Sequence, residues 1–449
     1  MYLRDTIAAI ATPPGPGGIG VVRVSGPRAE ALAGHVFQRR GAGPWQTHRL
    51  YHGRIIAADG TPIDDGLAVL MRAPRSYTGE DVLELHCHGS PVLLQRVLQS
   101  VLGRGARAAR AGEFTQRAFL NGKLDLAQAE AVVELVRART PDAAQAAAEQ
   151  LFGGLSAHLT ALRETLVRAK AHLEARIDFS DEELDLDDAA LLPELETARA
   201  GVAELLRTYE RGRLLRDGLR VAITGLPNAG KSSLLNALLG AERAIVTAEP
   251  GTTRDVIEAS LDIDGVPVVL YDTAGLRDGS DEAERLGVDR ARTVAAGADV
   301  VLVVLDTARA LAPQRRLLVG EPLAVLNKID LPTAWSAAEL GAIAGELPAV
   351  RVSATVPLGL DDLRQAIAQR AAVAWSDHLP TLTSARQYDS LAKADRSLAN
   401  AIDALRRGVP PDLVAVDVQA ALEHVGAVTG IVTSEDILDA VFREFCIGK

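Results

Sequence analysis

The alternation of hydrophobic and polar positions changes character twice along this chain. In residues 1–117, short β-like runs such as GVVRVSG and DVLELHCHG are separated by turns rich in glycine and proline. One helix-like stretch, SPVLLQRVLQSVL, follows the last of these runs. This pattern predicts a compact α/β domain.

From about residue 124 to 213, hydrophobic positions recur at helical spacing in long segments rich in Ala, Leu, Glu and Arg, so we expect antiparallel helices there. From residue 219, buried strand-like runs such as LRVAIT and DVVLVVLD alternate with helix-like segments as far as about residue 374. That alternation is typical of a doubly wound, mostly parallel sheet. From residue 384 the pattern is helical again.

A helical region that is split by an α/β unit indicates an inserted domain, because insertions are tolerated at exposed tips where the chain ends lie close. The predicted organisation is an N-terminal α/β domain, a helical domain in two parts and an inserted α/β domain, with boundaries at residues 1–117, 118–217 and 377–449, and 218–376.

Composition narrows the class of protein without naming a partner. The chain has 449 residues, of which 48% are hydrophobic, enough to bury two or three cores. Its net charge of −11 argues against a polyelectrolyte nucleic-acid binder, although a local basic face remains compatible with it. Cys87 and Cys446, the two cysteines, cannot form a disulfide framework or a cysteine-rich zinc site. We find no signal-peptide pattern and no long apolar run, and expect a cytoplasmic protein without a membrane span.

The strongest chemical motif is GLPNAGKS, residues 225–232, which fits G-x-x-x-x-G-K-[ST]. It follows the predicted strand LRVAIT and precedes the helix-like SLLNALLG, which is the context that a phosphate-binding loop needs. Backbone N–H groups at the helix start can surround phosphates, Lys231 can neutralise their charge, and the Ser232 hydroxyl can hold Mg²⁺.

Four further short motifs follow in the order expected of a guanine-nucleotide site. Thr253 in GTTRD is a candidate magnesium ligand, and Asp272 in DTAG can support the magnesium shell. Asp330 in NKID offers two acceptors for the N1–H and the exocyclic amine of guanine, a pair that adenine cannot donate. The backbone N–H of Ala354 in VSA can face guanine O6. Together these motifs predict that the nucleotide is GTP.

One position departs from the usual arrangement. Leu276 stands where Ras-like enzymes have a glutamine that orients the attacking water, and it has no hydrogen-bonding group. The nearby acidic segment DGSDEAERLG supplies Glu282 and Glu284 as candidates for that role, and both are equally compatible with a charged helix surface.

A basic segment precedes the helical region, and it fits either an anion- or RNA-binding patch or an ordinary solvated surface. Its charged residues are Arg104, Arg107, Arg110, Arg117 and Lys123.

The whole chain resembles the tRNA-modification GTPases called MnmE or TrmE. The resemblance rests on ATPPGPGGIGVVRVSG, GEDVLELHCHG, GEFTQRAFLNGKLDLAQAEA, the GTPase motifs placed within helices, and the final FCIGK. It implies an N-terminal folate-binding-like and dimerisation domain, a helical domain and an inserted Ras-like P-loop GTPase domain. It also implies a homodimer that acts with the FAD-containing protein MnmG (GidA), in a heterotetramer, on the wobble uridine of certain tRNAs.

The resemblance also assigns residues and cofactors. It implies potassium-dependent hydrolysis, with K⁺ ligands at Asn228, Thr247, Glu249 and Thr252, and it favours Glu284 over Glu282 for the water. With Mg²⁺ at Ser232 and Thr253, the residues expected to contact GTP are Asn228, Ala229, Gly230, Lys231, Ser232, Ser233, Thr247, Thr252, Thr253, Asp272, Thr273, Ala274, Gly275, Asn327, Lys328, Asp330, Ser353 and Ala354.

A second site is implied for 5-formyl- or 5,10-methylene-tetrahydrofolate, with contacts from Arg23, Glu84, Lys123 and Lys449. Cys446 would be catalytic only if the final CIGK folds back towards this pocket. TSEDILDAVFREF predicts a helix capped at Thr433 or Ser434 just before it. An alternative reading is a regulatory GTPase that binds ribosomal RNA during ribosome assembly and has no modification chemistry.

Overall fold

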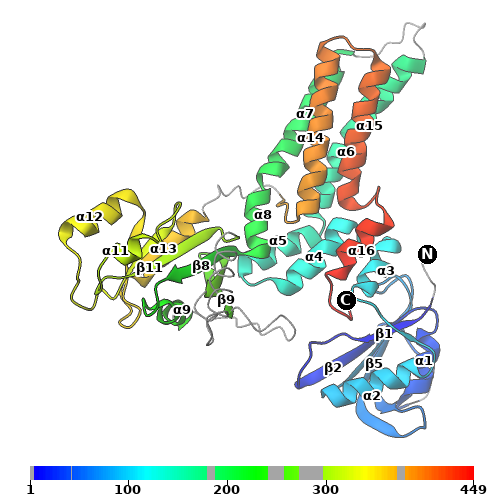
Figure 1. The fold of residues 1–449 in the computed structure, drawn as a ribbon. Coiled ribbons are helices and arrows are strands. Elements are labelled where there is room, and N and C mark those ends of the chain that lie inside the picture. Colours follow the sequence, from blue (N-terminus) through cyan, green and yellow to red (C-terminus); the bar gives the residue numbers. More distant parts are fainter. Residues whose placement is uncertain (1–4, 42, 179–187, 241–256, 273–296, 372–379) are drawn as a thin grey trace. The chain divides into compact units, whose positions relative to one another are not determined.

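The computed structural model describes residues 5–41, 43–178, 188–240, 257–272, 297–371 and 380–449 (Figure 1). It divides into two compact units. The first comprises Met1–Val133, Leu151–Leu195 and Arg396–Lys449, and the second comprises Glu134–Gln150 and Glu196–Asp395.

The first unit contains a mixed sheet whose described strands have the order β3-β4-β5-β6-β2-β1-β7. All neighbours are antiparallel except β1 and β7, which run parallel. The strands are β1 (Ile7–Ile10), β2 (Gly17–Ser25), β3 (Phe37–Arg39), β4 (Leu50–Ile56), β5 (Pro62–Met71), β6 (Val82–Gly89) and β7 (Arg107–Ala108). The predicted N-terminal α/β domain is confirmed, but β3, β4 and β7 were not predicted.

Two helices, α1 (Ala29–Val36) and α2 (Pro91–Leu102), cover one face of this sheet and bury residues such as Val22, Leu85 and Val97. Because side chains alternate across a strand, Arg23 and Glu84 project from the opposite face. On that face Ile7, Ala9 and Phe114 form a smaller cluster with Tyr77 packed against it.

The other described helices of the first unit come from distant parts of the sequence. Helix α6 (Gly154–Asp178) packs along α15 (Pro411–Thr429). Helix α16 (Glu435–Arg443) follows Ser434, whose hydroxyl accepts the N–H of Ile437, so the predicted cap is confirmed at Ser434. Phe442, in the last turn of α16, and Phe445, just after it, pack with Leu126 of α4 (Leu126–Arg137). The Phe442 ring also lies beside that of Phe119 in α3 (Glu113–Leu120).

The second unit contains a sheet whose described strands have the order β13-β12-β11-β8-β10-β9, parallel throughout except for the hairpin of β9 and β10. The strands are β8 (Leu219–Gly225), β9 (Ile257–Ile263), β10 (Val266–Asp272), β11 (Val300–Asp306), β12 (Leu323–Asn327) and β13 (Ala349–Arg351).

Helices cover both faces of this sheet. Leu234 of α9 (Lys231–Gly240) and Leu363 of α13 (Leu360–Arg370) pack into one cluster. Ile343 of α12 (Ala337–Glu346) packs into a second cluster, which also contains Leu311, the residue directly before the short helix α11 (Ala312–Arg315). The doubly wound sheet predicted from the alternating pattern is therefore confirmed.

Four more helices complete the described structure, and they confirm the helical character predicted on both sides of the α/β region. They are α5 (Pro141–Leu151), α7 (Asp188–Arg207), α8 (Tyr209–Asp217) and α14 (Ala385–Arg406). The buried side-chain amide of Gln150 donates to Thr383 Oγ1 at 3.1 Å, so α5 and the segment that leads into α14 share one core. The domain boundaries themselves stay a prediction. Among the helices described, none is long and apolar enough to cross a bilayer.

Candidate functional site

The loop between β8 and α9 has the shape of a phosphate-binding loop. Asn228 has a φ of 62° and Gly230 a φ of 98°, so both adopt the left-handed region that turns backbone N–H groups inwards. A Cβ on Gly230 would collide with the side-chain amide of Asn327, so only glycine fits there. Ala229 is buried beneath the loop, and Lys231, Ser232 and Ser233 begin α9.

Lys231 curls back over this loop. Its Nζ donates to the carbonyl oxygens of Gly225 at 3.1 Å and Leu226 at 3.0 Å. The ammonium group is therefore held at the mouth of the loop, beside the N-terminal end of α9, where a phosphate oxygen can replace the carbonyls as its partner.

The motif NKID lies beside the same loop. Asn327, the last residue of β12, is buried, donates from Nδ2 to the Ala229 carbonyl at 2.8 Å, and accepts at Oδ1 from the Ala354 N–H at 3.2 Å. The Ser353 hydroxyl donates to Asp330 Oδ1 at 2.6 Å. Five residues that the sequence assigned to guanine or to the loop thus form two hydrogen-bonded groups, which are linked by the peptide bond between Ser353 and Ala354.

One partner in this group was not found from the sequence. Asp306 ends β11 directly opposite Asn327 in the parallel register, and its buried carboxylate accepts from Lys328 Nζ at 2.7 Å. Lys328 also donates to the Asn228 carbonyl at 2.9 Å. The signal was present in the position of Asp306 at the carboxyl end of a buried strand, where α/β sheets place their ligand-contacting residues.

Of the residues that the sequence assigned in GTTRD and DTAG, only Asp272 lies within the described residues. Asp272 is the last residue of β10, opposite Ile223 of β8, and so lies at the same sheet edge as the loop. The following lie outside the described residues: Thr247, Glu249, Thr252, Thr253, Thr273, Ala274, Gly275, Glu282 and Glu284.

A second cluster of predicted residues lies in the first unit. Arg23 on β2 and Glu84 on β6 are direct cross-strand neighbours, and Arg23 Nε donates to Glu84 Oε1 at 2.8 Å. A contact from His86 Nε2 to Glu84 Oε2 at 3.3 Å, reinforced by Arg23 and opposed by burial, lowers the pKa of the Glu84 carboxyl below its ordinary value. Glu84 is therefore a carboxylate at neutral pH.

Aromatic rings surround Arg23. Its guanidinium carbon lies 5.5 Å from the ring centroid of Tyr77 and 5.8 Å from that of Phe114, within the range of cation–π attraction. Neither ring was singled out from the sequence, although Phe114 belongs to the motif GEFTQ. Charge, hydrogen-bond acceptors and flat apolar surface are thus gathered at one point of the sheet.

The CIGK segment, residues 446–449, docks beside this cluster. Arg23 Nη1 donates to the Gly448 carbonyl at 3.4 Å, and Ile447 forms a β-bridge with Ala111. The N–H groups of Gly112 and Phe114 donate to the carbonyl oxygens of Cys446 and Lys449 at 3.4 and 3.3 Å. The folding back on which the role of Cys446 depends is therefore present in the structure, and Cys446 is exposed.

Lys123 lies on the neighbouring loop. Its Nζ donates to the Pro74 carbonyl at 3.2 Å, and its aliphatic chain runs beside Gly79, on the loop that also carries Tyr77. The described contacts thus join Arg23, Glu84 and the backbone around Lys449 directly, and they place Lys123 on the loop that supplies one of the rings.

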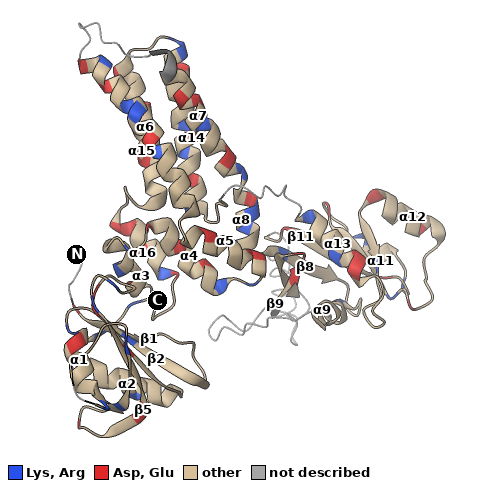
Figure 2. Ribbon diagram, turned by 180° about the vertical axis from the view of Figure 1, so that it is seen from behind, with Lys and Arg blue, Asp and Glu red and all other residues tan. Residues whose placement is uncertain are grey.

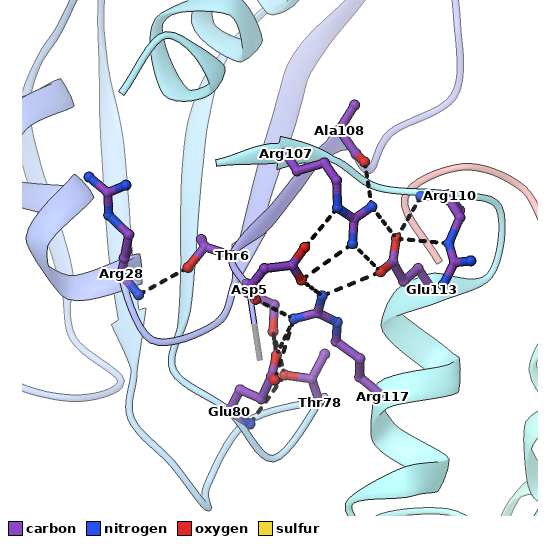
Figure 3. A network of polar contacts seen from close by, with 11 residues as sticks. Asp5, Thr6, Arg28, Thr78, Glu80, Arg107, Ala108, Arg110, Glu113 and Arg117 are labelled. Atoms are coloured by element: carbon purple, nitrogen blue, oxygen red, sulfur yellow. Dashed lines mark hydrogen bonds and ion pairs between the residues drawn. The ribbon is translucent and has the colours of Figure 1, made fainter. Parts of the chain in front are cut away.

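Two arginines of the basic segment, Arg107 and Arg117, are paired with carboxylates. Arg117 is buried and pairs with Asp5 at 2.6 Å, Glu80 at 3.1 Å and Glu113 at 3.3 Å, while Arg107 pairs with Asp5 and Glu113 at 2.8 and 2.7 Å (Figure 3). Arg117 cannot belong to a surface patch. Elsewhere, charges of both signs are interspersed along helices such as α6 and α14 (Figure 2).

Comparison with known proteins decides between the families that could carry such sites. A family model described as "GTP-binding protein TrmE N-terminus" matches residues 6–123, and one described as "MnmE helical domain" matches residues 126–446. The chain belongs to the MnmE family.

Relatives of the MnmE family match over the full length of the chain. The protein named tRNA modification GTPase MnmE in Moorella thermoacetica is 47% identical, with 100% of each chain covered, and that of a Synechococcus species is 46% identical, also with 100% of each covered. Among solved structures, the G domain of the T. maritima FeoB iron transporter matches 34% of this chain and 99% of its own, with 26% identity and a TM-score of 0.26.

MnmE membership agrees with the geometry of the second unit. The chain is a GTPase of tRNA modification.

Proposed function

We propose that this MnmE-family chain is a potassium-activated GTP hydrolase that acts with a flavoprotein partner of the MnmG (GidA) type. Together they would add an aminomethyl or carboxymethylaminomethyl group to carbon 5 of the wobble uridine in certain tRNAs, using a folate one-carbon unit. The observation that carries this proposal is the docking of the CIGK segment beside the Arg23–Glu84 pair. A GTPase that only regulates ribosome assembly has no need for such a second site.

The residues of the second site fit a reduced folate, either 5-formyl- or 5,10-methylene-tetrahydrofolate. Glu84 is an ionised acceptor suited to the N–H donors of a pterin ring, and the Tyr77 ring offers an apolar surface for it. Arg23, Lys123 and Lys449 supply positive charge for the carboxylates of the glutamate tail. A bound folate would supply the one-carbon unit.

In the GTP site, each described residue has a separate task. Lys231 exchanges its two carbonyl partners for phosphate oxygens, and Asp330, oriented by Ser353, accepts from the guanine N1–H and amine. Asn327 does not need to touch the base, because it holds the phosphate loop and the Ala354 segment at a fixed separation.

The same site fits Mg²⁺. Ser232 is exposed at the start of α9, and the adjacent ends of β8 and β10 bring Asp272 to the same edge of the sheet. Thr253 completes the proposed set of magnesium-binding residues. A bound magnesium ion would neutralise phosphate charge.

The potassium proposal rests on Asn228 within the described residues. It lies exposed at the loop tip in a left-handed conformation, and its side chain carries a carbonyl oxygen of the kind that ligates potassium. Thr247, Glu249 and Thr252 are the further proposed ligands. A bound potassium ion would supply positive charge where an arginine finger does so in other GTPases. Glu284 orients the attacking water, because Leu276 cannot.

The proposed assembly is a homodimer formed through the N-terminal domain and joined to the flavoprotein in a heterotetramer, acting in the cytoplasm. The exposed hydrophobic residues on the N-terminal sheet and its helices, Ile19, Leu50, Leu67 and Val92, support a protein interface there. In this assembly Cys446 is a candidate catalytic thiol. If Cys446→Ser kept full tRNA modification, the thiol would be dispensable, and Lys449 would be the residue that the CIGK segment delivers.

Calorimetric titration of the full-length protein with 5-formyl-tetrahydrofolate tests the folate site. We expect saturable binding that is lost in Arg23→Ala. Arg39→Ala is the matched control, because Arg39 also lies on a strand of this sheet and over two aromatic rings, those of Trp45 and Tyr51. The control should bind normally. Absence of saturable binding by the wild-type protein at millimolar ligand would favour the regulatory, ribosomal-RNA-binding GTPase.

A further inference from the structure

Besides the bond from Arg23 to Gly448, the CIGK segment is held by long hydrogen bonds to the turn at residues 111–114. The Gly112 and Phe114 N–H groups donate to Cys446 and Lys449 at 3.4 and 3.3 Å, at the long end of the range for N–H to oxygen bonds. Bonds of this length depend strongly on the direction of the donors. The shape of residues 110–114 therefore sets where the segment lies.

This turn is the start of α3, and no side chain caps it in the usual way. Its N-cap is Gly112, which has a φ of 66° and no side chain to accept from the following N–H groups. A Cβ at this position would lie 2.6 Å from the Phe442 carbonyl oxygen and 3.0 Å from Phe445 Cβ, so glycine is needed for the approach of the end of α16. The carbonyls of the CIGK segment take the place of the missing cap.

The turn is closed by the side chain of Glu113. Its Oε2 accepts the backbone N–H of Arg110 at 2.8 Å, which fixes the backbone immediately before Gly112. Its side chain is 5% exposed, so water offers it little competition. Glu113 thus acts on the donors of the CIGK segment through the backbone, not through contact with the segment.

The Glu113 carboxylate is itself held in place. Arg107 donates to its two oxygens at 2.7 and 3.1 Å, and Arg117 donates to Oε1 at 3.3 Å (Figure 3). Both guanidinium groups are also bonded to Asp5, and Arg117 to Glu80. Burial raises the pKa of Glu113, but the bonds from Arg107 and from the Arg110 N–H outweigh it, and the pKa lies below its ordinary value. The carboxylate stays charged in the network.

We propose that Glu113, clamped by Arg107 and Arg117, is a positioning residue for the CIGK segment. It fixes the first turn of α3 so that the N–H groups of Gly112 and Phe114 receive the segment beside Arg23. For catalysis, the inference rests on the proposed function, since the segment delivers Cys446 and Lys449 to the folate site. For docking, it stands on the contacts alone.

Glu113→Gln is the preferred variant because both arginines keep other carboxylate partners, so the protein should still fold. Arg117 keeps Asp5 and Glu80 as partners, and Arg107 keeps Asp5. An amide at position 113 has one oxygen to accept from two guanidinium groups, and its NH₂ group would face a donor. The turn should therefore loosen without general unfolding.

Hydrogen–deuterium exchange of the full-length protein measures the turn directly. In Glu113→Gln we expect the amides of Gly112, Phe114 and Lys449 to exchange at least about tenfold faster than in the wild type. Exchange in β1 and the melting temperature should change little. Arg110→Ala is the matched control: its guanidinium lies 3.7 Å from Glu113 and is largely exposed, and its backbone N–H remains. The control should exchange like the wild type.

A second variant keeps the test sharp if Glu113→Gln proves unstable. Arg107→Gln removes the shortest bond to Glu113 from a partly exposed position and should give the same acceleration at Gly112 and Phe114. Wild-type exchange in both variants, or equal acceleration in Arg110→Ala, would overturn the proposal. The exchange experiment needs neither folate nor tRNA, so failure of folate binding would refute the proposed function and leave this result standing.

The catalytic part has its own readout. Glu113→Gln should lower the yield of modified wobble uridine several-fold, while its rate of GTP hydrolysis equals that of the wild type. Gly448→Ala should also lower the yield of modified uridine without changing GTP hydrolysis. It should displace the CIGK segment directly, because Gly448 has a φ of 98° and a Cβ there would collide with the Ile10 carbonyl. Accelerated exchange with full modification would restrict Glu113 to docking and overturn its positioning role in catalysis.

Discussion

The side-chain amide of Asn327 donates a hydrogen bond of 2.8 Å to the backbone carbonyl of Ala229, 98 residues earlier in the chain. Its oxygen accepts from the Ala354 N–H, so one buried side chain ties the loop before Lys231 to the segment proposed to contact guanine. The two halves of the proposed nucleotide site are therefore linked through Asn327.

Asn327→Ala should weaken GTP binding by roughly 10- to 100-fold. The substitution leaves a carbonyl and an N–H group without their partner, each at a cost of about 1–3 kcal/mol, and the loop and the guanine segment can then separate. Titration with a fluorescent GTP analogue measures the change. Asn121→Ala is a fitting control, because Asn121 makes a similar amide-to-carbonyl bond, to Thr78, in the first unit. Unchanged affinity in Asn327→Ala would refute the coupling.

Replacement of K⁺ by Na⁺ should slow GTP hydrolysis by orders of magnitude and leave nucleotide affinity nearly intact. The proposed cation acts where charge develops in the transition state, so its loss affects the rate more than the binding of the ground state. Initial rates in matched KCl and NaCl buffers measure this. Equal rates would contradict the proposed potassium site and the role of Asn228 as its ligand.

Glu284→Ala should lower kcat with little change in GTP binding, because the proposed role is exerted on the water and not on the nucleotide. Steady-state kinetics with a parallel binding titration separates the two effects. Glu282→Ala is the control and should hydrolyse GTP normally. A wild-type rate in Glu284→Ala would return the role to Glu282 or to another group.

The two cysteines should differ sharply in reactivity. Burial raises the pKa of the Cys87 thiol to about 11, so that near pH 8 only about one molecule in a thousand carries the thiolate there, whereas Cys446 is exposed. Native protein treated with a thiol reagent should therefore react rapidly at one site, and Cys446→Ser should lose that phase. Since the reactive form of Cys87 is the deprotonated one, its reaction should rise with pH. Rapid reaction of both thiols at pH 8 would contradict the buried position of Cys87.

Much of the candidate nucleotide site could be proposed from the sequence because its residues lie close together in short motifs. The loop before Lys231 and the residues after Asn327 lie in short motifs at strand ends, and the parallel sheet brings those ends to one edge. Asp306 escaped notice because a strand-terminal aspartate has no motif of its own. Its importance depends on the register that places it opposite Asn327.

The second site was less accessible to sequence reasoning. Resemblance supplied Arg23 and Glu84, but their direct pairing depends on the register of β2 against β6. The clamp on Glu113 could not be foreseen, since Asp5 contacts Arg107 across 102 residues and Arg117 across 112. Read along the chain, these arginines look like a basic surface. In the fold, Arg107 and Arg117 instead form ion pairs with carboxylates of the same unit.

The central claim is that this chain modifies wobble uridines with the help of the docked CIGK segment and the Arg23–Glu84 site. The most direct test is mass analysis of tRNA nucleosides from cells that lack this protein, complemented with the wild type or with Arg23→Ala. We predict that the 5-aminomethyl-type wobble uridines disappear without the protein, return with the wild type and stay absent with Arg23→Ala. Unchanged wobble uridines in cells that lack the protein would contradict the account.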